Sequence, residues 1–291
     1  MNKRLLIAIA NYGDSQLHYL KKMLLIFQTY TYQTEIVIDT TVDLSDLIAD
    51  INLPITQRFF KPAVGQALPF KHRKYFAEHL SQHDYFLYTE NDLDIPQQAI
   101  DFIVQQTDHL QKDEIIGLYR YEIDQGVYYL TDHDIKTPLS NFAAWTEHGQ
   151  SFFAPFVTHS GCYFLNQAQL RHAIASGGYL TNPHTGPYGM LEQGASDIYT
   201  QCGFKQKFLP LPIDPVLIHH MPDKYINMPT ALPRFSIDAL SVFMKKMGLK
   251  PKLKRMYPPN FLQRTYKKLR YEIKMFESKI RNGLKAKAKS Q

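Results

Sequence analysis

The stretch LLIAIAN at residues 5–11 decides how this sequence folds. Its first six residues are all apolar, which is typical of a strand buried on both faces of a sheet. Apolar side chains then recur at helical spacing within residues 14–30, with Asp14 placed to cap that helix, and the segment EIVID at 35–39 is a second short strand. A strand, a helix and a second strand of these lengths form the βαβ unit of a parallel sheet. We therefore predict an α/β fold.

The alternation of strand and helix patterns continues to residue 220. Glycine, proline and aromatic residues interrupt it between residues 141 and 156, where we expect loops. In the helix predicted at 70–82, Phe70, Lys74, Ala77 and Leu80 share one side. The other predicted helices are 96–111, 167–176 and 195–201, and the other predicted strands are 85–89, 115–121, 127–130, 160–165, 207–211 and 216–220.

Length and composition favour one large globular domain with an extension. The chain has 291 residues, of which 44% are hydrophobic and 21% charged. Its longest apolar runs, 5–10 and 23–27, fall short of the roughly 18 to 20 residues that cross a bilayer, and the first is too short for a signal peptide. We expect a cytosolic protein. Cys162 and Cys202 have neither disulfide nor zinc-site spacing and are expected to be buried apolar side chains.

Charge divides the chain into two parts. Residues 1–244 contain 17 Lys and Arg against 25 Asp and Glu, a net charge of −8, whereas residues 245–291 contain 16 against 2, a net charge of +14. We predict a main domain at 1–240 and a basic helical extension at 241–291. From residue 260 its apolar side chains step by four and three along an amphipathic helix: Leu262, Tyr266, Leu269, Ile273, Phe276 and Ile280.

Three interpretations of this basic helix stay open. It can lie on an anionic membrane surface such as the inner face of the membrane, pack on the main domain, or pair as a coiled coil. We favour the membrane, as a peripheral association. Nucleic acid is a poorer partner, because the acidic part of the chain would repel its phosphates.

Polar residues follow three predicted strands at their carboxyl ends. Asn11 follows the first strand, Asp39 ends the second, and the acidic segment ENDLD at residues 90–94 follows the strand 85–89. Ligands of open α/β sheets bind at this edge. Carboxylates fixed at a strand end can hold a divalent cation such as Mn²⁺ or Mg²⁺. The alternative is a polar turn in which Asp94 caps the next helix.

The segments KHRKYFA (71–77) and YFLYTENDLDI (85–95) resemble GT-A glycosyltransferases, especially the N-acetylglucosaminyltransferase I type. In that family a His-Tyr-Arg/Lys-Trp-Ala helix precedes a strand ending in Glu-Asp-Asp-Leu-Glu-Val. The segment LIAIAN (6–11) and the strand ending at Asp39 resemble the family's nucleotide-binding start. The likeness covers about the first 110 residues. It implies a GT-A fold, a Rossmann-like mixed sheet flanked by helices that binds a nucleotide-diphospho-sugar.

The resemblance also implies roles for the acidic segment. Asp92 matches the direct metal ligand, and Glu90 and Asn91 match residues that contact the ribose and sugar of the donor. Asn91 stands where the family has an aspartate, and its amide can form hydrogen bonds but brings no charge. That difference leaves the sugar open and makes Asp94 a candidate additional ligand.

Two strand-end residues match the base-binding positions of the family. They are Asn11 and Asp39, and an aspartate that accepts the imide N–H of uracil would favour UDP. Plain turn-forming roles are the alternative for both residues. Arg73 is a candidate contact for the phosphates, with an exposed helix cation as the alternative.

An inverting transfer needs a base for the acceptor hydroxyl. The segment EQGASDI at 192–198 occupies the place of the family's acidic pair, so Asp197 is our first candidate and Glu192 the second; simple helix capping is the alternative. Some GT-A enzymes complete the metal shell with a late histidine, which makes His219 and His220 candidates. Adjacent residues of a strand point to opposite faces, so at most one of them can be that ligand.

The leading hypothesis is metal-dependent transfer of a sugar from a nucleotide sugar to a glycan or lipid-linked acceptor. A catalytically silent sugar-binding or scaffold protein with the same fold is the alternative that Asn91 keeps open. A sugar-phosphate nucleotidylyltransferase is less favoured, because NYGD at residues 11–14 is not a glycine-rich basic loop. The sequence also lacks a Walker phosphate loop and a Gly-x-Gly-x-x-Gly motif after its first strand.

Overall fold

The computed structural model describes residues 3–107, 110, 113–131, 143–147, 150–154, 159–204, 206–211, 214–226, 232–233 and 252–253. The chain divides into two compact units, residues 1–255 and residues 256–291. The second unit, with most of the predicted basic helix, lies outside the described residues, and so does the predicted boundary at residue 240. None of the described helices is long and apolar enough to cross a bilayer.

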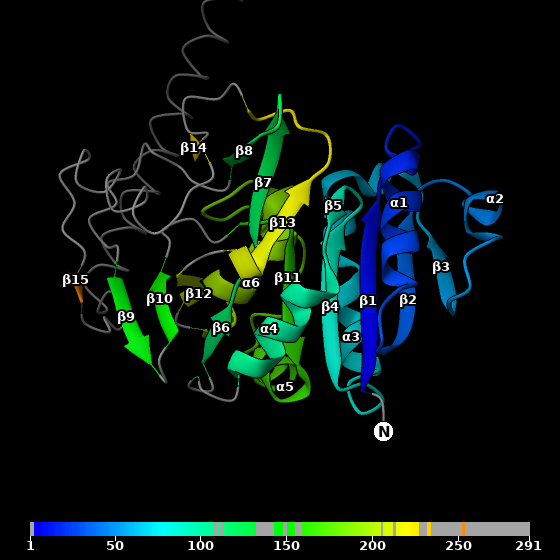
Figure 1. Cartoon of the computed structure of the whole chain (residues 1–291). Helices are drawn as coiled ribbons and strands as arrows, with labels where there is room; N and C mark the ends of the chain where they lie inside the picture. The colour runs from blue at the N-terminus through cyan, green and yellow to red at the C-terminus, as the bar shows by residue number, and fades with distance from the viewer. Residues whose placement is uncertain are drawn as a thin grey trace, which may run out of the picture. The chain divides into compact units, whose positions relative to one another are not determined.

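A five-stranded sheet with β1 (Arg4–Asn11) at its centre organises the first unit (Figure 1). The strand order is β11-β4-β1-β2-β3; the first four strands in the chain are parallel, and β11 runs antiparallel to β4. This arrangement confirms the predicted α/β class, a mixed Rossmann-like sheet flanked by helices. The other strands of this sheet are β2 (Gln33–Thr40), β3 (Ile55–Phe59), β4 (Tyr85–Glu90) and β11 (Cys162–Asn166).

Helices cover both faces of this sheet because successive residues of β1 point to opposite sides. Leu5, Ile7 and Ile9 pack in the core cluster that contains residues of α1 (Leu17–Phe27) and α4 (Gln97–Thr107). Leu6 and Ala8 pack in a second cluster with residues of the remaining longer helices. Those helices are α3 (His72–Glu78), α5 (Gln167–Ala175) and α6 (Met190–Thr200).

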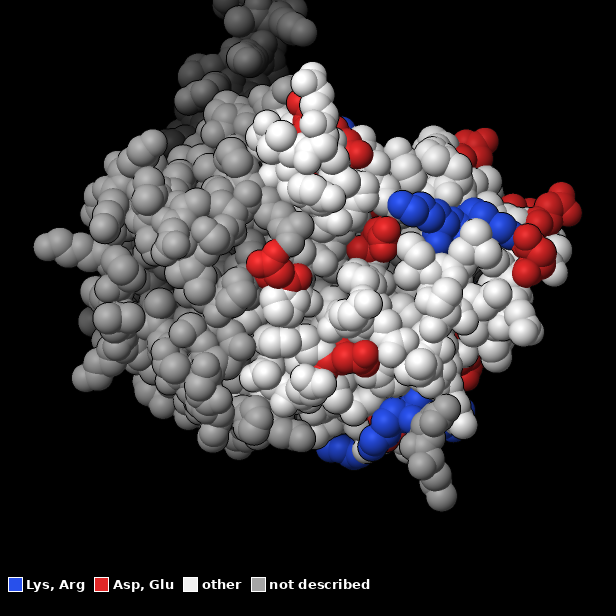
Figure 2. Space-filling view, in the orientation of Figure 1, with Lys and Arg blue, Asp and Glu red and all other residues white. Residues whose placement is uncertain are grey.

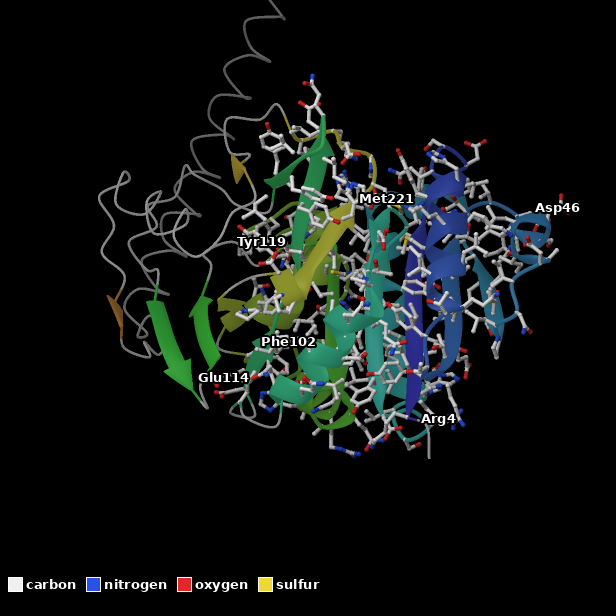
Figure 3. The ribbon with its side chains drawn as sticks, in the orientation of Figure 1. Arg4, Asp46, Phe102, Glu114, Tyr119 and Met221 are labelled. Carbon is white, nitrogen blue, oxygen red and sulfur yellow. The ribbon has the colours of Figure 1, made fainter. Side chains whose placement is uncertain are left out.

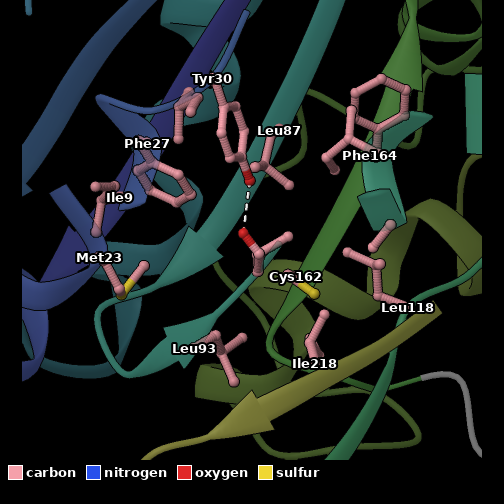
Figure 4. Packing of buried hydrophobic residues seen from close by; sticks show 14 of the residues in the cluster. Ile9, Met23, Phe27, Tyr30, Leu87, Leu93, Leu118, Cys162, Phe164 and Ile218 are labelled. Atoms are coloured by element: carbon pink, nitrogen blue, oxygen red, sulfur yellow. Dashed lines mark hydrogen bonds between the residues drawn. The ribbon is translucent and has the colours of Figure 1, made fainter. Parts of the chain in front are cut away.

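Figure 4 shows part of the first core cluster, where Met23 and Phe27 of α1 lie close to Ile9. Each side chain of this kind contributes about 1.5–3 kcal/mol when fully buried. The hydroxyl of Tyr30, with the dashed line in Figure 4, donates a hydrogen bond of 2.6 Å to the carbonyl of Ile95. That bond connects the end of α1 to the segment that follows the acidic residues 90–94.

Two further sheets complete the described part of the first unit. Their strand orders are β15-β9-β10-β12-β6 and β14-β8-β7-β13-β5. The antiparallel pairing of β13 with β5 places His219 opposite Asp94 and His220 opposite Leu93, so a late strand lies beside the acidic segment. The strands are β5 (Leu93–Asp94), β6 (Glu114–Ile116), β7 (Tyr119–Asp124), β8 (Val127–Leu130), β9 (Ala143–Glu147), β10 (Gln150–Ala154), β12 (Gln206–Leu211), β13 (Leu217–His220), β14 (Leu232–Pro233) and β15 (Lys252–Leu253). The short helices are α2 (Ser45–Ile48), η1 (Pro62–Phe70) and η2 (Asp214–Val216).

Several predicted elements differ from the structure. The expectation of loops at 141–156 is wrong, because β9 and β10 form an antiparallel pair there. The predicted strand 115–121 is two strands, β6 and β7, interrupted at residues 117–118. The helix predicted at 195–201 already begins at Met190. Its first turns were missed because Gly189 and Gly194 are poor helix formers.

The helix predictions at 14–30 and 70–82 were too long. The first helix begins at Leu17, its N-cap position is Gln16, and no side chain caps it, so Asp14 does not have the predicted role. The second is only the seven-residue α3, and Phe70 belongs to η1, which ends there. The buried residues of α3 are His72, Arg73 and Phe76, whereas Lys74, which we placed on one side with Phe70, is exposed.

Candidate functional site

A pocket of about 620 Å³ lies at the carboxyl ends of β1 and β4. In Figure 3, Arg4 marks the amino end of β1, and Met221, directly after β13, lies toward the opposite edge. Strand ends, the turn before α1, η1 and the start of α6 all contribute to the pocket. Its lining residues are Ala10, Tyr12, Gln16, Gly65, Gln66, Leu68, Pro69, Glu90, Asn91, Asp92, Arg120, His159, Leu191, Glu192, His220, Lys224 and Tyr225.

Asp92 is a buried carboxylate with its two oxygens in different situations. Its Oδ2 accepts a hydrogen bond from Gln16 Nε2 at 3.0 Å and lies 3.3 Å from His220 Nε2. Its Oδ1 is buried and has no hydrogen-bond partner among the described residues. Burial favours the protonated acid, but the hydrogen bond and charge of His220 hold the pKa of Asp92 below its ordinary value. Asp92 is therefore an ionised group with one oxygen fixed and the other unpaired.

His220 lies between two carboxylates. Its Nε2 faces Asp92, and its Nδ1 faces Oε1 of the fully buried Glu122. Burial lowers the pKa of His220, but its hydrogen bonds with Asp92 and Glu122 outweigh burial and raise that pKa above 6.5. The other oxygen of Glu122 accepts a hydrogen bond of 2.6 Å from the backbone N–H of Tyr225. His220 thus holds Asp92 in place and is itself held by Glu122.

His219 points away from this arrangement. Its Nε2 lies 2.9 Å from Oδ1 of Asp223, and its ring stacks on Tyr121 with centroids 5.2 Å apart. It is not among the lining residues of the pocket. The side chains of the two adjacent histidines therefore face opposite sides of β13, and of the two only His220 contacts Asp92.

Glu90 and Asn91 both line the pocket but have different surroundings. Burial, and then the charge of Asp92, raise the pKa of Glu90 to about 7. The Asn91 amide nitrogen donates a hydrogen bond of 2.6 Å to Asn11 Oδ1, and the Asn11 amide nitrogen donates one of 3.1 Å to Thr40. These bonds connect the ends of three neighbouring strands. A carboxylate at position 91 would face the Asn11 oxygen without a donor, which accounts for the amide.

Asp39 and Asp94 lie outside the pocket lining. Asp39 is buried and forms an ion pair with Arg58 at 2.6 Å. Burial raises the pKa of Asp39 to about 6, although the Arg58 charge opposes that shift. Asp94 lies on β5, with its Oδ2 3.5 Å from Lys22 Nζ. The structure brings neither carboxylate to Asp92.

Arg73 and Asp197 form a buried ion pair behind the pocket. Arg73 Nη2 lies 2.9 Å from Asp197 Oδ2, and the exposed fractions of the two side chains are 3% and 0%. Arg73 also donates to the backbone carbonyls of Tyr179, Gln193 and Gly194. Neither charged residue lines the pocket, whereas Glu192, one turn earlier on α6, does. Of the two candidate bases, Glu192 is therefore accessible from the pocket and Asp197 is not.

Residues that the sequence did not single out contribute much of the pocket. Arg120, Lys224 and Gln16 line it, and the charges of the two cations help to lower the pKa of Asp92. Arg120 arrives through the parallel pairing of β7 with β13, opposite Ile218, which no local pattern predicts. Lys224 lies four residues after His220, past the end of β13, and no sequence pattern marks it.

The chemistry of the lining suits an anionic ligand that carries a cation. On the face drawn in Figure 2, acidic and basic side chains of the described residues lie in small groups, some of them adjoining, and form no continuous field of one charge. No group of three or more His, Cys, Asp or Glu side chains in the described part is arranged to hold a metal ion. A cation at Asp92 would take its other ligands from substrate oxygens and water, as Mg²⁺ commonly does.

Comparison with known proteins assigns no family to this chain. No family model and no curated protein sequence matches the chain. Among solved structures, the chain is similar to a crystal structure of 4-diphosphocytidyl-2C-methyl-D-erythritol synthase, with a TM-score of 0.35 and 14% sequence identity. The match covers 60% of this chain and 80% of that one. A likeness at this level identifies neither an activity nor a substrate here.

Proposed function

We propose that this protein is a divalent-cation-dependent glycosyltransferase that uses a nucleoside diphosphate sugar, with UDP as the nucleotide. It transfers the sugar to a hydroxyl group of a glycan or lipid-linked acceptor. The observation that carries the proposal is Asp92, whose Oδ1 is buried and unpartnered while Oδ2 is held by Gln16 and His220. An unpaired carboxylate oxygen is costly to bury unless a cation or donor compensates it.

The cation site fits Mn²⁺ or Mg²⁺. Asp92 would hold the ion through Oδ1, and the donor's phosphate oxygens would complete the shell. A bound dication neutralises the charge that develops on the departing diphosphate. Asp94 and His219 take no part in this proposal, because they lie outside the pocket lining, and His220 acts by holding Asp92.

Two cations of the protein support binding of the diphosphate. Arg120 and Lys224 line the same pocket as Asp92. Arginine and lysine attract phosphate groups and form charge-assisted hydrogen bonds with them. We therefore assign the phosphate contacts to Arg120 and Lys224 and not to Arg73, because Arg73 forms a buried ion pair with Asp197.

Glu192 is the proposed base. An inverting transfer requires a carboxylate that can reach the acceptor hydroxyl and accept its proton. Glu192 lines the pocket from the first turn of α6, beside the exposed Leu191. Asp197 has no exposed surface and already accepts hydrogen bonds from Arg73 and Thr200. A buried, paired carboxylate is poorly placed for this step.

The choice of UDP depends on the resemblance of the strand-end residues Asn11 and Asp39 to base-binding positions. Asn91 does not argue for a silent protein, because its amide is explained by the hydrogen bond to Asn11. Asp39 is paired with Arg58 and does not line the pocket, so base recognition would require the Asp39–Arg58 pair to act together.

Calorimetry with UDP and Mn²⁺ tests this function. We expect Mn²⁺ to strengthen UDP binding in the wild type, and Asp92→Asn to remove that gain. Asp94→Asn is the matched control, because it makes the same chemical change outside the pocket and should leave binding unchanged. Equal UDP affinity with and without Mn²⁺ in the wild type would refute the proposal. Transfer assays with Glu192→Gln then test the base, since a loss of kcat with intact UDP binding is expected.

The basic segment at 241–291 leads to a separate proposal, peripheral binding to an anionic membrane surface that brings the enzyme to a lipid-linked acceptor. Its support is the net charge of +14 on residues 245–291 and their amphipathic pattern. The measurement is flotation with anionic liposomes, before and after deletion of residues 260–291. Equal flotation of the two proteins would contradict it.

A further inference from the structure

Gln16 occupies a helix N-cap position without capping the helix. It precedes α1, its φ and ψ are −114° and 15°, and its side chain forms no cap hydrogen bond. Serine, threonine, aspartate and asparagine are the residues that stabilise this position by accepting from backbone N–H groups. The longer glutamine side chain instead extends to Asp92, 76 residues further along the chain, and donates a hydrogen bond of 3.0 Å to Oδ2. The local helix therefore does not explain the residue.

The contact determines how the Asp92 carboxylate is oriented. Oδ2 has two partners, Gln16 Nε2 at 3.0 Å and His220 Nε2 at 3.3 Å, whereas Oδ1 has none. Two donors on one oxygen restrict rotation of the carboxylate about its last bond and leave the other oxygen unoccupied. Gln16 comes from the turn after β1 and His220 from the end of β13, so two separate segments fix the same group.

We propose that Gln16 is a positioning residue for the cation site, orienting Asp92 so that Oδ1 is available to the ion. This inference depends on the proposed cation site and adds a residue to it. A neutral amide suits the role because it donates a hydrogen bond to Asp92 and carries no charge. A lysine at this position would bring a positive charge that repels the cation. Groups that orient a metal ligand through a hydrogen bond typically account for a 10- to 100-fold difference in metal affinity.

The test compares Gln16→Met with Gln33→Met. Methionine has a similar length but no N–H donor, and Gln33 is an exposed glutamine at the start of β2, outside the pocket lining. Calorimetry measures the affinity for Mn²⁺ in the presence of UDP and the affinity for UDP without metal. We expect Gln16→Met to weaken Mn²⁺ binding about tenfold and to leave metal-free UDP binding unchanged. Gln33→Met should change neither affinity.

A double-mutant cycle distinguishes positioning from a structural role. In an Asp92→Ala background, Gln16→Met should have no further effect on UDP or Mn²⁺ binding, because the group it orients is absent. The melting temperature of metal-free Gln16→Met should stay within about 2 °C of wild type, because Gln16 lies in a partly exposed turn.

The outcomes separate this inference from the function on which it depends. Wild-type protein without Mn²⁺-enhanced UDP binding removes the cation site itself. Normal enhancement that Asp92→Asn abolishes and Gln16→Met leaves intact overturns only the role of Gln16. Weaker metal-free UDP binding in Gln16→Met also overturns it, because the residue would then contact the nucleotide directly.

Discussion

Replacing Asp197 with alanine should lower the free energy of unfolding of this protein strongly, because Asp197 is the buried counter-ion of Arg73. The carboxylate is fully buried and lies 2.9 Å from Nη2 of Arg73, whose side chain is only 3% exposed. Removal of one partner leaves a guanidinium charge in the interior without its counter-ion. Breaking a buried ion pair in this way typically costs about 3–5 kcal/mol.

Other contacts of the pair place the expected cost within that range. Arg73 keeps three backbone carbonyl acceptors, at 3.0–3.2 Å, which partly compensate the unpaired charge. Against this, the Thr200 hydroxyl loses the Asp197 carboxylate as its hydrogen-bond acceptor, at 3.2 Å. The Gln193 amide nitrogen loses the same acceptor. We therefore expect about 4 kcal/mol, which corresponds to a fall in melting temperature of about 8–16 °C in a domain of this size.

The assay is thermal and urea unfolding of three proteins: Asp197→Ala, Asp197→Asn and the double variant Arg73→Met with Asp197→Leu. Asparagine keeps a hydrogen-bond acceptor for Arg73 and should cost less, about 1.5–3 kcal/mol. The double variant removes both charges and should recover part of the stability lost in Asp197→Ala, since no charge is left unpaired.

A catalytic role for Asp197 predicts a different pattern. In that case Asp197→Ala would retain its melting temperature and lose only turnover. A fall in melting temperature of less than about 3 °C would contradict the structural role, and so would a double variant that is no more stable than Asp197→Ala. Glu192→Gln is the matched comparison, because it should lower kcat with little change in stability.

Three further predictions concern single sites. Burial, and then the charge of Arg73, lower the pKa of His72 well below its ordinary value of 6.5, so its contribution to stability is present above pH 6.5 and is lost as pH falls. Between pH 7.5 and 5.5 the wild type should lose more stability than His72→Gln in urea unfolding, on the order of 1 kcal/mol, and parallel pH profiles would contradict this. Asn91→Asp places a carboxylate against the Asn11 oxygen and should cost about 1–3 kcal/mol, measured by the same method; an unchanged unfolding midpoint would show that the bond is unimportant. Gly161→Ala should lower the melting temperature more than Gly126→Ala. Both glycines have a positive φ, but only at residue 161 would an added Cβ lie 2.9 Å from a Glu90 carboxylate oxygen. Equal melting temperatures of the two variants would show that this close contact costs no stability.

Local patterns in the sequence determined the central architecture. The apolar run at 5–10 became the middle strand of the sheet, and the strand 85–89 placed Glu90 and Asp92 at the edge where the pocket lies. The adjacent residues His219 and His220 point to opposite faces of β13. These features follow from hydrophobic periodicity and from the alternation of side chains along a strand, which depend only on neighbouring residues.

Local patterns failed where turns and short strands compete. The aromatic segment at 143–154 has the composition of a strand pair, yet its glycine and proline neighbours suggested loops. In the helix predicted at 70–82 the burial of His72 and Arg73 was not foreseen, because an amphipathic pattern does not predict that a histidine and an arginine will be buried. Both residues are buried because distant partners satisfy them.

The tertiary structure alone decided which charged residues belong to the pocket. Arg73 is removed from it by Asp197, 124 residues away in the sequence, and Asp39 is engaged by Arg58. Arg120 is brought into it by strand pairing with β13. A charge can be buried only where a partner compensates it, and these partners come from segments far apart in the chain. The sequence by itself therefore determined where a site forms, and long-range packing determined which side chains line it.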